Sequence, residues 1–142
     1  MACQSVQQAR ERLEPPDAKV RQAMQQAEMD FFFAGKPMEA ALYRLLLERM
    51  FSELPSFEIK VQKTQITFIN PRVFACVSLK WKNTLTVTFG LPSKAESPRI
   101  FAASQPYPNR WTHHVKIKTP EEIDEELMEW LKSAHAFSQN KA

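Results

Sequence analysis

Glycine is scarce in this chain, because its 142 residues include only Gly35 and Gly90. Loops that cradle phosphate groups and fingerprints that bind dinucleotides need several glycines close together. The sharp turn that presents the nucleophile of many hydrolases also needs flanking glycines. The scarcity of glycine therefore excludes the commonest nucleotide-binding and hydrolase motifs.

Cysteine is equally scarce, with only Cys3 and Cys76. One lies in an expected tail and the other in an expected strand, so no disulfide is expected and a reducing compartment fits. Two cysteines and three histidines, scattered along the chain, match no zinc-binding spacing, and we assign no metal ligand and no cofactor. No apolar run is long enough to cross a bilayer, and no N-terminal segment resembles a signal peptide. We therefore expect a cytoplasmic protein with no membrane partner.

The charge of the chain is distributed unevenly around its net value of +3. Residues 57–118 hold ten basic and two acidic side chains, whereas residues 119–142 hold two basic and six acidic ones. The basic middle is the one electrostatic feature that indicates an anionic partner. The acidic run near the C-terminus is expected to be a solvated helix face.

Apolar residues at helical spacing predict three helices, over residues 17–34, 37–54 and 120–137. Thr119 is the expected N-cap of the last helix, Pro120 its first residue, and Glu122 the partner of Thr119 in a capping box. Residues 1–16 are expected to form a tail or short helix, and residues 17–142 a single domain.

From Phe57 to Phe89 the apolar period changes to two, and turn signals separate the segments. This pattern predicts short antiparallel strands in a meander. Residues 91–110 contain four prolines and are expected to form a long loop, with an edge strand over residues 99–102. The predicted fold is α+β, an antiparallel meander sheet of about five strands with helices packed on one face.

A strand is predicted directly after the long loop, and its alternation separates two neighbouring histidines. Trp111 and His113 fall on the apolar side, and His114 falls on the polar side with lysines. The two histidines therefore cannot hold one metal ion between them. A histidine on an apolar face is more often a hydrogen-bonded core residue than a ligand.

Several segments together carry a family resemblance: KVQKTQI (60–66), FA (74–75), VSL (77–79), TFGLP (88–92), SPRI (97–100), PYPNRWTHH (106–114) and EEIDEEL (121–127). They resemble small bacterial proteins of the domain-of-unknown-function family 5655 over residues 36–138, and the tyrosine-to-histidine segment is the most specific. The resemblance implies a bacterial, cytoplasmic α+β domain. It implies no activity, because the family has no established one. Members also occur fused to other uncharacterised domains, which suits a binding or regulatory module.

The first functional hypothesis is a binding module that uses the polar face of the sheet. That face is expected to present a set of basic side chains among threonines: Lys60, Lys80, His114, Lys116 and Lys118. Such a surface suits a phosphate-rich ligand or nucleic acid. However, only Phe74 is expected to lie there among the aromatic residues, and base-stacking platforms need two or three. A solvated face, with lysines for solubility, is the alternative.

The second hypothesis is a small-molecule pocket, or an enzyme, built from five residues: Tyr107, Asn109, Arg110, Trp111 and His113. Arg110 could hold a carboxylate or phosphate in a forked contact, and His113 could act as an acid or base. No catalytic residue is assigned, because no nucleophile with an adjacent base is visible. Alternatively, Asn109 and Arg110 only form hydrogen bonds with the backbone of the long loop, and Trp111 only fills the core.

The third hypothesis is a structural homodimer or a protein that binds a protein partner. Residues 31–33, Phe51 and Trp81 offer apolar surface that one small core does not need. We prefer binding to catalysis on this sequence.

Overall fold

The computed structural model describes residues 26–139, and the chain divides into two compact units, Met1–Ala34 and Gly35–Ala142. The expected tail over residues 1–16 and the start of the first expected helix lie outside the described residues. Residues 26–32 are helical, and a turn over residues 33–35 ends the helix. Gly35 has a φ of 72° there, a conformation that favours glycine at a helix end. The extent of a single domain over residues 17–142 stays a prediction.

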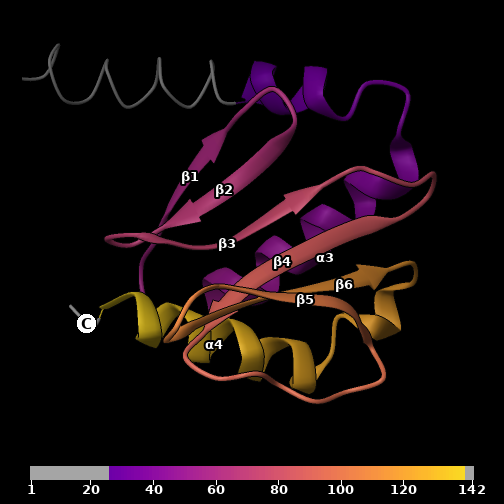
Figure 1. Ribbon diagram of the computed structural model, residues 1–142. Coiled ribbons are helices and arrows are strands. Elements are labelled where there is room, and N and C mark those ends of the chain that lie inside the picture. The colour runs from indigo at the N-terminus through magenta and orange to yellow at the C-terminus, as the bar shows by residue number, and fades with distance from the viewer. Residues whose placement is uncertain (1–25, 140–142) are drawn as a thin grey trace, which may run out of the picture. The chain divides into compact units, whose positions relative to one another are not determined.

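The second unit is a six-stranded antiparallel sheet with two helices (Figure 1). Its strands are β1 (Glu58–Val61), β2 (Gln65–Ile69), β3 (Val73–Ser78), β4 (Leu85–Leu91), β5 (Ile100–Tyr107) and β6 (Arg110–Ile117). They lie in the order β1-β2-β3-β4-β6-β5. The α+β class and the meander over the first four strands are therefore confirmed.

The sheet has six strands where about five were expected, because much of the proline-rich segment is β5. Proline cannot donate to a strand ladder, which led to the prediction of a long loop. β5 lies at the edge of the sheet, outside β6. An edge strand tolerates Pro106, since one side of the strand needs no partner. The expected long loop is thus reduced to residues 92–99, which lie before β5.

Two helices cover one face of the sheet, α3 (Pro37–Glu53) and α4 (Glu125–Gln139). α3 begins with Pro37, as expected, and Leu54 follows its last residue. Tyr43 of α3 stacks on Phe68 of β2 with 6.5 Å between ring centroids. The other face of the sheet, which we call the open face, carries Thr67, Cys76, Thr88 and His114 in one cross-strand row.

The start of the last helix differs from the prediction. Thr119 and Pro120 open a 3-10 turn, Pro120–Glu122, rather than the α-helix. The Glu122 carboxylate accepts hydrogen bonds from the backbone N–H groups of Lys118 and Thr119 at 2.6 and 3.1 Å. The N-cap of α4 is Asp124, whose carboxylate accepts from the N–H of Leu127 at 3.1 Å.

The core lies between the sheet and the two helices. Its largest fully buried side chains are Phe68, Phe74, Phe89, Leu42, Leu46, Met50, Ile66, Leu85, Ile117, Leu127, Met128 and Leu131. Phe74 was expected on the polar face, and this expectation is wrong. A register shift after Phe68 displaces the alternation, and the Phe74 ring contacts Phe68 and His135 of α4. Across residues 26–139 no helix combines the length and the apolar character needed to span a membrane.

Candidate functional site

The β5–β6 hairpin carries the five residues that were expected to form a pocket. Tyr107 and Arg110 close the hairpin as its last pair. The turn between them is held by Gln105, whose side-chain amide donates to the carbonyl of Pro108 at 2.8 Å. The edge position of β5 leaves Tyr107 exposed at 64%. The hairpin thus projects a tip of polar and aromatic side chains.

The tip borders a groove of about 540 Å³, which we call the tip groove. It lies where β3 begins, the hairpin turns and α4 ends, and its lining residues are Arg72, Val73, Tyr107, Pro108, Asn109, Arg110, Phe137 and Ser138. Three of the five expected residues therefore come together here. Among residues 26–139, two basic side chains line the groove, and no acidic one does. The volume falls within the range of about 300–1,000 Å³ that is usual for ligand sites.

Arg110 is positioned by close approach to β4. A β-carbon added to Gly90 would lie 2.5 Å from Nη2 and 2.7 Å from Cζ of Arg110. The guanidinium therefore rests on the only place in β4 that lacks a side chain. Within residues 26–139 the Arg110 side chain has no hydrogen-bond or ion-pair partner, and the same holds for Arg72.

Arg72 was not among the candidate site residues that the sequence indicated. Arg72 and Arg110 are 38 positions apart, and only the strand order brings them to one groove. The local sequence around Arg72 carries no signal of this. The long-range pairing of β4 with β6 brings the two arginines to the same groove.

His113 does not belong to the tip groove. Its side chain is fully buried, and its Nε2 accepts a hydrogen bond from the N–H of Ala95 at 3.0 Å. Because a backbone N–H can only donate, the ring is neutral with its proton on Nδ1. Burial lowers the pKa of His113, and the charge of Lys94 lowers it further, while the carbonyl of Phe89 opposes this shift. A neutral, enclosed imidazole holds the loop before β5 in place.

Trp111 also faces that loop rather than the groove. The Lys94 ammonium lies 5.6 Å from the centroid of its ring, a cation–π distance. Trp111 and His113 therefore anchor neighbouring residues of one loop. The expected five-residue pocket is divided, with three residues at the tip groove and two beneath the loop over residues 92–99.

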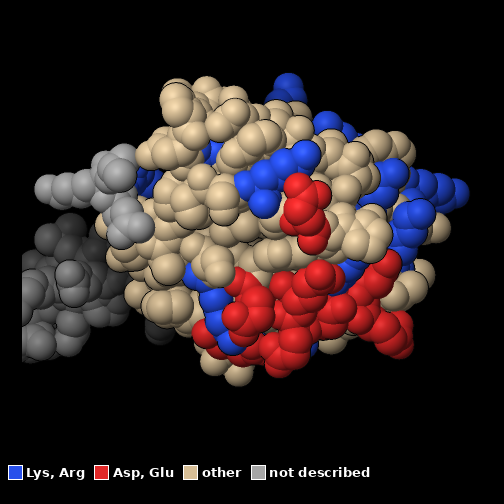
Figure 2. Space-filling model, turned by 60° about the horizontal axis from the view of Figure 1, so that its bottom comes forward, with Lys and Arg blue, Asp and Glu red and all other residues tan. Residues whose placement is uncertain are grey.

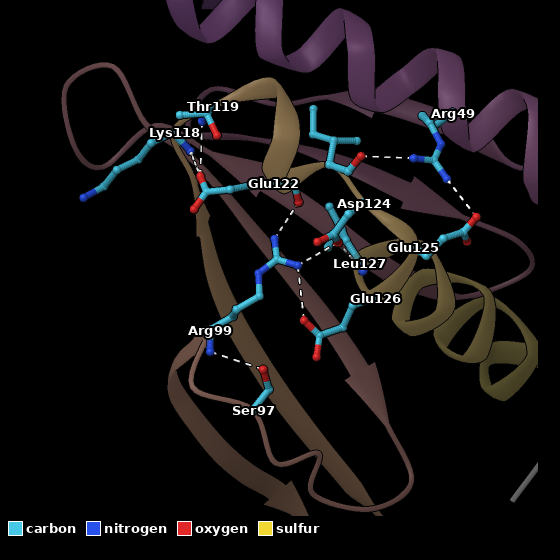
Figure 3. Close-up of polar contacts among 11 residues, drawn as sticks. Arg49, Ser97, Arg99, Lys118, Thr119, Glu122, Asp124, Glu125, Glu126 and Leu127 are labelled. Carbon is cyan, nitrogen blue, oxygen red and sulfur yellow. Dashed lines mark hydrogen bonds and ion pairs between the residues drawn. The ribbon is translucent and has the colours of Figure 1, made fainter.

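The other end of this loop is fixed by Arg99 (Figure 3). Its guanidinium donates to the Asp124 carboxylate at 2.7 Å and to the Glu122 carbonyl at 2.5 Å. It lies 3.3 Å from Glu126 and above the ring of Trp130, 5.9 Å from the centroid. Although partial burial alone would raise the pKa of Asp124, the Leu127 N–H and Arg99 lower it overall. Arg99 is thus a structural clip, and both terminal nitrogens of its guanidinium bond to acceptors within the protein.

Acidic side chains gather around this clip and form a band on one face of the molecule (Figure 2). Glu121, Glu125, Glu126 and Glu129 are exposed there. Within the described residues, no group of three or more His, Cys, Asp or Glu side chains is arranged to hold a metal ion. We assign no site to this band.

The five basic residues expected on the open face are spread apart. Lys60 and His114 lie in the same cross-strand row, four strands from each other, which separates their backbones by about 19 Å. His114 Nδ1 lies 2.8 Å from the Thr88 hydroxyl. Burial lowers the pKa of His114, and the charge of Lys80 adds to this. Lys80 and Lys118 lie outside the strands, whereas Lys60 lies in β1 and both His114 and Lys116 lie in β6.

The open face has two aromatic residues that the sequence did not place there, although Trp81 was expected as apolar surface for a protein partner. Trp81 and Phe101 are 42% and 44% exposed, and their ring centroids lie 5.5 Å apart. The Lys80-Trp81-Lys82 turn, basic on both sides of a tryptophan, was the available signal. Phe101 lies within the edge strand that was expected over residues 99–102, but no face was assigned to its side chain.

Comparison with known proteins identifies a family without an activity. The family model described as a domain of unknown function (DUF5655) matches residues 29–138, which begins slightly earlier than the expected residue 36. No curated protein and no solved structure matches the chain.

Proposed function

We propose that this chain, which belongs to the DUF5655 family, is a binding module that takes an anionic group into the tip groove. The observation that carries the proposal is the pair of arginine side chains, Arg72 and Arg110, that line one acid-free groove without partners in the described chain. The anionic group is a phosphate or a carboxylate, because both fit the forked donors of arginine.

Two other half-buried arginines of the second unit, Arg49 and Arg99, support this reasoning for Arg110, which is also half-buried, whereas Arg72 is exposed. Arg49 donates to Glu53 at 2.7 Å and to the Ile123 carbonyl at 3.0 Å. Arg99 is paired even more completely. The chain thus satisfies its structural arginines internally, so a half-buried arginine left without an acceptor at a groove is available for a ligand.

The groove chemistry favours binding over catalysis. The Ser138 hydroxyl lies 2.7 Å from each of the Asn70 and His135 carbonyl oxygens, so its single proton is already engaged within the protein. His113, the expected acid or base, lies beneath the loop instead. The exposed ring of Tyr107 and the amide of Asn109 can orient a ligand, but neither is an activated nucleophile. An enzyme built on Arg110 and His113 together is therefore not supported.

A bacterial, cytoplasmic setting belongs to the same proposal. The free thiol of Cys76 supports a reducing compartment. Measurement of the mass in solution by light scattering would separate a monomeric binding module from the homodimer hypothesis.

The test is calorimetric titration with inorganic phosphate, pyrophosphate and citrate, with thermal shift as a second readout. We expect saturable binding of at least one anion, weakened roughly tenfold or more in Arg110→Ala and in Arg72→Ala, since hydrogen bonds to charged groups contribute about 1.5–3 kcal/mol. Arg44→Ala is the matched control, because Arg44 is exposed on α3 and does not line the groove. Equal weakening by all three substitutions, or no binding by the wild type, would refute the proposal.

A further inference from the structure

A second feature of the open face points to the class of ligand. Lys116 lies between Trp81 and Phe101, with its ammonium 4.2 and 4.9 Å from the two ring centroids. The rings meet edge to face at 83°. We call these three residues the aromatic cluster. It sits on a face that is otherwise built mainly of threonine, serine and other polar residues.

The aromatic cluster is held rigidly. Trp81 belongs to the turn between β3 and β4, where Asn83 has a φ of 56°. The N–H of Asn83 donates to the buried carboxylate of Glu39 on α3 at 2.7 Å. Phe101 and Lys116 lie on paired strands β5 and β6. The rings are therefore presented in place before any ligand arrives, which lowers the entropic cost of binding.

A polar, basic stripe connects the aromatic cluster to the tip groove. Alternate residues of β6 share one side of the sheet, namely Arg110, Thr112, His114 and Lys116. Six residue steps separate Arg110 from Lys116, a distance of about 20 Å at roughly 3.3 Å per residue. Strands β2 to β6 contain no acidic residue. The stripe thus offers cations at both ends, aromatic rings at one end and Tyr107 at the other.

We propose that a single-stranded nucleic acid lies along this stripe, with bases stacked on Trp81 and Phe101 and backbone phosphates at Lys116 and Arg110. The inference rests on the proposed function, because the tip groove supplies one of the phosphate subsites. It deepens that function by naming the anionic ligand.

The combination of rings and cations favours this class of ligand over others. Base–aromatic stacking is tolerant of sequence, and a basic track binds the backbone. A duplex keeps its bases stacked on one another, so exposed rings on a sheet would gain nothing from it. Each ring has two faces, and Lys116 occupies one, so the exposure of both rings above 40% leaves surface for a base.

The experiment is fluorescence anisotropy with a labelled twelve-nucleotide oligo-dT, the corresponding oligo-rA and a duplex of the same length. The expected result is that both single strands bind more tightly than the duplex. Trp81→Leu and Phe101→Leu should each weaken binding by about 5- to 150-fold, the range for loss of one stacked base. Lys116→Gln should reduce the slope of log affinity against log salt by about 0.7, the value for one phosphate contact on a single strand.

Matched controls come from the rest of the second unit. Phe51→Leu removes an exposed ring on α3, and Lys63→Gln removes an exposed lysine between β1 and β2. Both should leave oligonucleotide binding unchanged. Urea denaturation of every variant shows whether it is folded, and leucine preserves most of the apolar surface.

The outcomes separate this inference from the proposed function. Suppose that pyrophosphate binds through Arg110, that oligonucleotides bind no more tightly than pyrophosphate, and that Trp81→Leu leaves oligonucleotide affinity unchanged. The inference is then overturned, and the proposed anion site in the tip groove is retained. If Trp81→Leu abolishes oligonucleotide binding while Arg110→Ala has no effect on any anion, the stacking platform is supported and the groove proposal fails. Equal binding of duplex and single strands overturns the inference. A dimer in light scattering that Trp81→Leu dissociates also overturns it, because the cluster is then an interface between copies.

Discussion

Replacing Gly90 by alanine tests the position of Arg110 without changing any residue that lines the tip groove. The added β-carbon would lie 2.5 Å from Nη2 of Arg110, a distance that real contacts do not allow. The atoms in the way belong to the far end of a flexible side chain, so the guanidinium gives way rather than the backbone. Gly90 lies opposite Thr112 in the β4–β6 ladder and does not have a positive φ.

Two free-energy terms set the size of the effect. For folding, alanine is favoured over glycine within a strand by about 0.5–1 kcal/mol, and Arg110 has no hydrogen-bond or ion-pair partner within residues 26–139 to lose. The free energy of unfolding should therefore stay within about 1 kcal/mol of the wild type. For binding, a displaced guanidinium forfeits contacts of about 1.5–3 kcal/mol, which weakens affinity for the anion roughly 10- to 150-fold.

The assay is a double-mutant cycle read by pyrophosphate titration. Gly90→Ala, Arg110→Ala and the double variant are compared with the wild type, and urea denaturation is measured for each. If Gly90 acts only through Arg110, the double variant should bind no more weakly than Arg110→Ala alone.

Two results would refute this reasoning. One is wild-type affinity in a folded Gly90→Ala variant, which would mean that the observed position of Arg110 is irrelevant to the ligand. The other is a loss of several kcal/mol of stability that Arg110→Ala does not restore, which would mean that the backbone and not the guanidinium had to move.

Three further predictions concern stability. Asp124→Ala should lower the free energy of unfolding by about 1–2 kcal/mol in urea, because it removes the N-cap of α4 and a partner of Arg99; an unchanged midpoint would contradict this. Leu46→Ala should cost about 2–5 kcal/mol since Leu46 is fully buried, whereas Leu45→Ala, at a partly exposed neighbour, should cost far less. Burial lowers the pKa of His113, so the unfolded chain takes up this proton near pH 6.5 while the folded chain does not. Stability should therefore fall as the pH drops below about 6.5, and His113→Gln should lack this part of the dependence when denaturation is compared at pH 7 and 5.5.

The start of α4 shows what local sequence can and cannot predict. Thr119-Pro120 and Asp124 are both good helix starts, and the sequence contains them in tandem. The first opens a 3-10 turn, and the second caps the α-helix. Arg99, 25 residues from Asp124 in the sequence, also binds that carboxylate. A local pattern could not show this contact.

The proline-rich segment shows the same limit in the sheet. Its prolines correctly indicated irregular backbone over residues 92–99. The edge strand expected over residues 99–102 is the start of β5, but the prolines concealed its continuation to Tyr107. Whether a strand can accept Pro106 depends on its position at the edge, and that position follows from the order of all six strands.

The candidate site was predictable to the extent that it is local. Tyr107, Asn109 and Arg110 were identified because they adjoin one another at a turn. Strand alternation correctly placed His113 on the core side. The position of Arg72 at the groove could not be predicted without the strand order. Phe74 was assigned to the wrong face because a register shift cannot be seen in a period-two sequence pattern.

The placement of β5 outside β6 has a consequence for the order of assembly. β4 pairs with β6, and β6 follows β5 in the chain. β4 therefore cannot pair with the next strand in the sequence, and its partner is the strand after that one. The β5–β6 hairpin closes locally, and we expect it to form first and then dock on β4 as a unit. Until it docks, the edge of Leu85–Leu91 offers unpaired backbone groups on a largely apolar strand, which favours pairing with other chains. The hairpin that carries the tip groove therefore also protects the growing sheet from aggregation.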